Sequence, residues 1–112
     1  MTKQEILNYL NKSYDEGLVD ELYIYLRNDR LICNSMNRTL VDFVNRKMKK
    51  NNFDKILFIQ AVKLEIDKHL SSSYFKKEYG EYLPNRIDST TKYQLAKYIA
   101  SYILYNYFGI NL

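Results

Sequence analysis

Few side chains in this 112-residue sequence have the types and spacing that catalysis requires, because there is one histidine and one cysteine. His69 follows Glu65 by one helical turn, a spacing that predicts a local ion pair or hydrogen bond more simply than a catalytic dyad. Cys33 is too distant from His69 in sequence to share with it the closely spaced ligands of a zinc site. The sequence therefore predicts no metal, no cofactor and no enzyme, although a reaction that needs only carboxylates and a lysine stays open.

Tyrosine forms the most informative pattern in the sequence. The chain has twelve tyrosines and no tryptophan, and five of the tyrosines fall within the last twenty residues. A tyrosine combines an apolar ring with a polar hydroxyl group, so it suits the edge of a core or the interface with a partner. Residues 98–112 contain no basic side chain, which argues against base stacking beside a nucleic-acid backbone. The candidate partner-binding residues are Tyr98, Tyr102, Tyr105 and Tyr107.

A second candidate site is a group of basic side chains in the middle of the sequence, where residues 34–86 carry eleven bases and six acids. The group consists of Arg46, Lys47, Lys49, Lys50 and Lys55. Such a group can bind the phosphates of a nucleic acid or an acidic surface of a protein. At the end of a helix it also complements the helix dipole, without any partner. The patch becomes larger if the fold brings in Arg38, Lys76 and Lys77.

Glycine and proline are rare, with three glycines and one proline, and they stand where helices are expected to begin or end. Thr2 and Glu5 have the spacing of a capping box, Asp54 stands where an N-cap is expected, and Gly109 where a helix stops. The other expected helix starts are Ser13, Asn34 or Ser35, the run Ser71–Ser73, and Ser89 or Thr90. We therefore expect an all-α fold, a single bundle-like domain of five or six helices over residues 1–112.

Two of the expected helices are apolar over more of their surface than one packing face requires. In the helix that follows Asp54, a second apolar face formed by Leu57, Ala61 and Leu64 predicts packing against other helices on two sides. The last helix has only a narrow polar stripe, which consists of Gln94, Lys97, Ser101 and Tyr105. Either this helix passes through the centre of the bundle, or one of its faces meets another chain.

Composition narrows the class of protein. The sequence has no apolar run long enough to cross a bilayer and no apolar segment near residue 1 of the kind that directs secretion, so we expect a cytoplasmic protein. We expect it to bind a protein partner, or a second copy of itself as a homodimer, through the tyrosines. A small inhibitor or regulator from a phage or mobile element fits a chain rich in lysine, asparagine, isoleucine and tyrosine. The alternative is a nucleic-acid-binding protein that uses the basic residues 46–55.

Overall fold

Six α-helices and one 3₁₀-helix, with no strands, make up the computed structural model, which describes every residue from Met1 to Leu112. The elements are α1 (Lys3–Leu10), α2 (Glu16–Asn28), α3 (Arg30–Lys49), α4 (Lys55–Leu70), α5 (Ser73–Tyr79), the 3₁₀-helix η1 (Gly80–Tyr82) and α6 (Ser89–Phe108). Their apolar faces share one core of 20 buried side chains. The predicted all-α fold is confirmed.

Several predicted helix ends are confirmed. The hydroxyl group of Thr2 accepts a hydrogen bond from the backbone N–H of Glu5, whose carboxylate accepts one from the backbone N–H of Thr2, as in a capping box. Asp54 caps α4, and Ser72 caps α5. Gly109 ends α6 in the left-handed conformation, with a φ angle of 64°, which glycine adopts without the steric cost that a Cβ atom brings.

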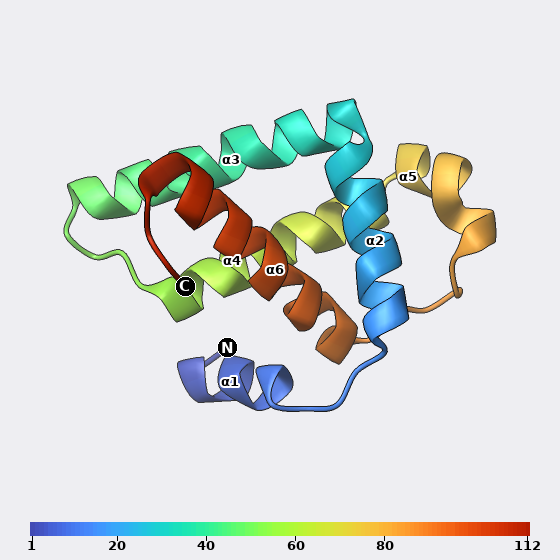
Figure 1. Cartoon of the computed structure of the whole chain (residues 1–112), viewed down its shortest axis with the longest axis horizontal. Coiled ribbons are helices and arrows are strands. Elements are labelled where there is room, and N and C mark those ends of the chain that lie inside the picture. Colours follow the sequence, from blue (N-terminus) through green and yellow to red (C-terminus); the bar gives the residue numbers. More distant parts are fainter.

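Three predicted helix starts are wrong, because aspartates cap those helices instead. The caps of α2, α3 and α6 are Asp15, Asp29 and Asp88, in place of Ser13, of Asn34 or Ser35, and of Ser89 or Thr90. In each case a carboxylate oxygen accepts a hydrogen bond from the backbone N–H three residues on, and its negative charge suits the positive end of the helix dipole. Asp29 also ends α2, so α2 and α3 meet at a corner of one residue (Figure 1).

The centre of the fold is occupied by α6, which packs most extensively against α4 and also contacts α1, α2 and α3 (Figure 1). Its buried side chains are Thr91, Tyr93, Gln94, Leu95, Ala96, Ile99, Ala100, Ile103 and Leu104. The predicted polar stripe is wrong at Gln94, which is buried because its side-chain amide donates to the carbonyl oxygen of Leu10 at 2.7 Å. The exposed stripe runs instead through Tyr98, Tyr102 and Tyr105. The helix therefore passes through the bundle and still presents one face to solvent.

Against the prediction, α4 packs through one face only. Its buried side chains are Phe58, Ile59, Val62 and Ile66. On the second apolar face, Leu57 and Leu64 are exposed and Ala61 is half-buried. Contacts with α1, α3 and α6 cover the first face, and no element covers the second. The second apolar face of α4 is therefore part of the molecular surface.

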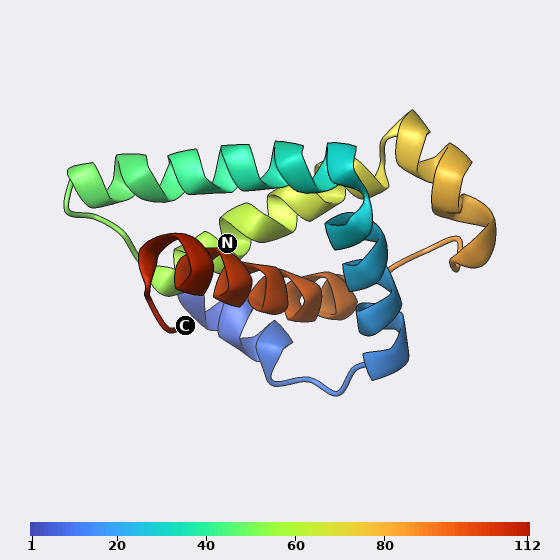
Figure 2. The same ribbon diagram turned by 45° about the horizontal axis from the view of Figure 1, so that its top comes forward.

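The short elements α5 and η1 lie at the end of the molecule where α2 meets α3 (Figure 2). Phe75 is buried in the core, and Tyr79 stacks on Tyr25 of α2 with ring centres 4.7 Å apart. The hydroxyl groups of Tyr74 and Tyr79 both donate to the carboxylate of Asp29, at 2.7 and 2.5 Å. A few aromatic side chains thus hold this segment, and a loop leads back from it to α6.

Candidate protein interface on helix α6

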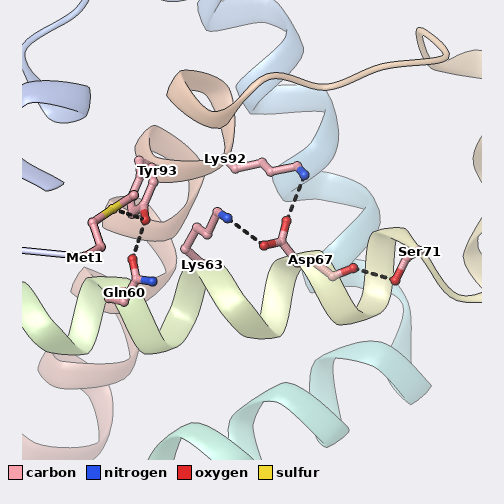
Figure 3. A network of polar contacts seen from close by, with 7 residues as sticks. All are labelled: Met1, Gln60, Lys63, Asp67, Ser71, Lys92 and Tyr93. Carbon is pink, nitrogen blue, oxygen red and sulfur yellow. Dashed lines mark hydrogen bonds and ion pairs between the residues drawn. The ribbon is translucent and has the colours of Figure 1, made fainter. Parts of the chain in front are cut away.

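The four tyrosines selected from the sequence are all exposed, but they do not share one side of α6. Tyr107 follows Tyr98 by nine residues, about half a turn around the helix axis, and turns toward Asn37 of α3. The exposed fractions of the four run from 42% for Tyr102 to 64% for Tyr105. The other tyrosine of α6, Tyr93, is buried: its ring stacks on that of Tyr9 with centres 4.9 Å apart, and its hydroxyl group donates to the side-chain oxygen of Gln60 (Figure 3). The exposed group, which we call the tyrosine face, consists of Tyr98, Tyr102 and Tyr105 on one side of α6, with Tyr107 at its edge toward α3.

Tyr98 is held by a tyrosine from a distant part of the chain. The hydroxyl oxygens of Tyr14 and Tyr98 lie 3.1 Å apart and share a hydrogen bond. That bond, with partial burial and the negative charges of Glu16 and Asp20, raises the pKa of Tyr14 to about 12. The N-terminal end of the tyrosine face is therefore fixed against the segment that leads into α2.

Two polar side chains from α2 and α3 connect Tyr102 with Tyr107. The guanidinium group of Arg27 lies over the ring of Tyr102, 4.7 Å from its centre, and donates to Oδ1 of Asn37 at 2.8 Å. Nδ2 of Asn37 donates in turn to the hydroxyl oxygen of Tyr107 at 3.2 Å. A cation over an exposed aromatic ring stabilises by about 0.5–1 kcal/mol. This series of contacts orients both tyrosines relative to α2 and α3.

Sequence reasoning missed three residues that position the tyrosine face: Tyr14, Arg27 and Asn37. All three are remote from α6 in sequence, and only the folded chain brings them to it. Arg27 directly follows the buried residue Leu26, and Asn37 follows the buried residue Met36. A polar residue next to an apolar one is too common on amphipathic helices to mark a site. The sequence therefore held no usable signal for these contacts.

The tyrosine face is polar, and α6 itself adds little charge to it. Between its rings α6 carries Ser101, Asn106 and Lys97, and the residues Ser89–Phe108 include no aspartate or glutamate. Antibody paratopes share this mixture, in which tyrosine supplies contact area at low entropic cost and small polar residues adapt to the partner. The three tyrosines on one side of α6 together offer roughly 300 Å², somewhat less than half of the roughly 800 Å² that each partner contributes to a standard interface.

The basic residues selected from the sequence do not form a free patch. Three of them have partners within the chain: Arg46 pairs with a carboxylate one turn away, Lys47 lies over an aromatic ring, and Lys55 donates to a backbone carbonyl group. The side chains of Lys49 and Lys50 are exposed and form no ion pair or hydrogen bond. Arg46 is therefore the one member of the predicted basic group with an acidic partner, and Lys49 and Lys50 are the two with no partner at all.

The fold does not enlarge this basic group. Lys76 and Lys77 belong to α5, which lies at the opposite end of the molecule from the C-terminal end of α3 (Figure 1). Arg38 is on α3 itself, but about two turns before Arg46. The three residues that were expected to extend the patch therefore lie apart from it.

The basic side chains of α3 and the tyrosine face of α6 lie on different sides of α3. Lys47 covers the ring of Phe43, which stacks on Phe58 of α4 with ring centres 6.0 Å apart. Asn37 of the same helix faces α6 instead, where it bonds to Tyr107. The members of the basic group on α3 are therefore separated from the tyrosine face, whereas Lys55 of α4 lies nearer to it and donates to the carbonyl oxygen of Asn111 beyond α6.

The predicted pairing of His69 with Glu65 is confirmed, with Nε2 and Oε2 3.5 Å apart. Burial lowers the pKa of His69 more than the neighbouring carboxylate raises it. Cys33 is a free, half-buried thiol whose sulfur accepts a hydrogen bond from Nδ2 of Asn37 at 3.6 Å. No three side chains of His, Cys, Asp or Glu are grouped as a metal ion requires. Local contacts thus account for both of these side chains.

Comparison with models of protein families, with curated proteins and with solved structures found no match. None of the helices combines the length and the apolar character that crossing a membrane requires. The fold and the site together define an all-α protein of six helices whose central helix presents an aromatic face.

Proposed function

We propose that this chain is a non-enzymatic binding protein that recognises another protein through the tyrosine face of α6. One observation carries the proposal: four exposed tyrosines lie on one helix, and three of them are oriented by contacts from Tyr14, α2 and α3. Side chains that are already oriented lose less conformational freedom when a partner binds. The arrangement therefore supports a binding role for these rings.

The chemistry of the tyrosine face favours a protein over a nucleic acid as the partner. Lys97 is the one charged residue that α6 exposes. The centres of protein interfaces are rich in aromatic residues and poor in charges, whereas nucleic-acid binding depends on cations that neutralise phosphates. A second copy of the chain is one such protein partner, with the two faces related by a two-fold axis.

Tyr105→Ala tests this proposal, because the side chain of Tyr105 is exposed and forms no hydrogen bond or ring contact within the chain. Tyr82→Ala is the matched control, since Tyr82 is exposed to 62% and lies on η1. We expect Tyr105→Ala to weaken binding of a captured partner about thirtyfold, as for a typical interface hot spot. Tyr82→Ala should bind like the wild type. Equal binding by the two variants contradicts the proposal.

Sedimentation velocity at low micromolar concentration separates the two kinds of protein partner. A dimer that Tyr105→Ala dissociates identifies a second copy as the partner. A chain that stays monomeric in both forms assigns the tyrosine face to a different protein, for which the capture experiment is the test. More specifically, we propose that the protein is a cytoplasmic inhibitor or regulator of the kind that phages and mobile elements encode. The composition of the chain supports this.

Nucleic-acid binding is the second candidate function, and it rests on Lys49 and Lys50. These two lysines are exposed at the end of α3 and keep their charges free of internal partners. Lysines that neutralise phosphates give an affinity that falls steeply with salt. Reversing both charges should therefore abolish the binding.

A further inference from the structure

A cavity of about 830 Å³ opens between the C-terminal end of α4, the α5 segment with its following loop, and the start of α6. Small-molecule sites in proteins commonly have volumes of roughly 300–1,000 Å³. Its apolar lining consists of Leu70, Phe75, Leu83 and Ile87, which are buried or half-buried. Lys76 and Arg86 also line it and are exposed. The cavity thus combines four apolar side chains, among fourteen lining residues, with cations nearer to solvent.

The charges around this cavity are unbalanced. Both carboxylates that line it have partners: Asp88 caps α6 by accepting from the backbone N–H of Thr91 at 2.8 Å, and Asp67 binds lysines. The side chains of Lys76 and Arg86 form no ion pair or hydrogen bond within the chain. The lining therefore carries three cations, Lys76, Arg86 and Lys92, against two carboxylates.

Two lysines that bind Asp67 add positive charge on this side of the cavity (Figure 3). The carboxylate of Asp67 lies 2.7 Å from Nζ of Lys63 and 2.8 Å from Nζ of Lys92, whose side chains are only 17% and 24% exposed. Burial raises the pKa of Asp67, but the hydrogen bonds and charges of the two lysines outweigh it and lower the pKa overall. Two ammonium groups thus share one carboxylate at a site shielded from water, where an extra charge acts more strongly.

We infer that this cavity binds a small organic anion. The carboxylate or phosphate group of the anion lies against Lys76, Arg86 and Lys92. The apolar part of the anion contacts Phe75 and Leu83. The site is independent of the tyrosine face, which belongs to the outer side of α6, whereas the cavity adjoins the start of that helix.

An NMR titration of the ¹⁵N-labelled chain with phenyl phosphate, benzoate and phenol tests the inference. These probes share an aromatic ring and differ in charge. We expect saturable shifts at the amides of Ser71, Arg86, Ser89 and Lys92 with the two anions, and about tenfold weaker binding of phenol. The stronger of the two anions then tells whether the site prefers phosphate or carboxylate. Failure to saturate by about 10 mM, or equal binding of phenol, overturns the inference.

Variants of the exposed cations complete the test without touching the ion pairs of Asp67. Arg86→Gln and Lys76→Gln should each weaken anion binding about threefold, the scale of one exposed charge pair. Lys49→Gln, which removes an unpaired charge at the far end of the molecule, should leave it unchanged. Equal effects of Arg86→Gln and Lys49→Gln overturn the inference. If Tyr105→Ala binds the anions as tightly as the wild type does, the anion site and the tyrosine face are independent of each other.

Discussion

Asp29 and Tyr79 are joined by a 2.5 Å hydrogen bond that spans 50 positions of sequence. The same carboxylate accepts a second hydrogen bond from Tyr74, and its other oxygen caps α3 at the backbone N–H of Ile32. Burial alone raises the pKa of Asp29, but these hydrogen bonds outweigh it, so the pKa lies below its ordinary value. One residue thus ends α2 through its backbone N–H, which donates to the carbonyl oxygen of Tyr25, while its carboxylate begins α3 and holds α5 in place.

Asp29→Asn is expected to cost stability at neutral pH but not in acid. Because the folded chain lowers the pKa of Asp29, its ionised form stabilises the fold fully above the unfolded value of about 3.9, and this contribution is lost as the pH falls through the lower folded value. Urea unfolding should show a difference of about 1–2 kcal/mol from the wild type at pH 7, which shrinks as the pH falls below about 4.

The control for this prediction is Tyr79→Phe, which removes one hydrogen bond to Asp29 and keeps the stacking on Tyr25. It should destabilise the protein by about 1 kcal/mol at pH 7. A stability difference between Asp29→Asn and the wild type that stays constant from neutral to acidic pH would show that the charge of Asp29 contributes nothing.

The hydrogen bond between Tyr14 and Tyr98 predicts a late tyrosine titration. Tyr98→Phe removes the partner and should bring the pKa of Tyr14 from about 12 back toward the ordinary value of about 10. Because the folded pKa is raised, this bond stabilises the fold below about pH 10 and is lost as the pH rises through about 12. The ring ¹³Cζ resonance of Tyr14 reports the titration. Tyr82→Phe should leave it unchanged, and no response to Tyr98→Phe would refute the coupling.

Replacing Gly80 or Gly109 by alanine should change the stability of the protein in opposite directions, although both glycines have open space around them. At both Gly80 and Gly109, the position that an alanine Cβ would occupy has no atom within 4 Å, but Gly109 has a φ angle of +64°. Gly109→Ala should therefore destabilise the protein by about 1 kcal/mol through backbone strain alone. Gly80→Ala, in a conformation that alanine adopts freely, should stabilise it by about 0.4–1 kcal/mol. Thermal unfolding measures both, and equal shifts would contradict this account.

Charge reversal at the end of α3 tests nucleic-acid binding. The double variant of Lys49→Glu and Lys50→Glu should abolish any retardation of DNA or RNA seen at about 50 mM salt, because the phosphates lose their cations. The double variant of Lys76→Glu and Lys77→Glu changes the net charge equally at the opposite end of the molecule, and it should retain most of the binding. No retardation by the wild type dismisses this candidate.

Helix existence and most core faces were predictable because they depend on residues within one or two turns of each other. The capping box at Thr2 and the stop at Gly109 are of this kind. The start of α3 was not, since aspartate, asparagine and serine all cap helices well. Sequence spacing does not choose between Asp29 and Asn34, whereas the fold does, through the bonds that Asp29 also makes to α5.

The exposed tyrosines were predictable as a group, but their surroundings were not. A helical wheel places Gln94 beside Lys97 on a polar stripe, yet Gln94 is buried because the carbonyl group of Leu10 satisfies its amide. Likewise, Arg27 and Asn37 contact the tyrosine face only because the corner between α2 and α3 places both helices beside α6. Long-range pairing of this sort leaves no periodic trace in a single sequence.

The one-residue corner between α2 and α3 makes the chain intolerant of length changes at that point. Inserting a residue after Asp29 rotates every later position of α3 by about 100° relative to α2, which turns Met36 and Leu40 out of the core. The loop between η1 and α6 does not fix the rotation of one helix relative to another in this way. We therefore expect an inserted residue to destabilise the fold more after Asp29 than between the exposed residues Pro84 and Asn85.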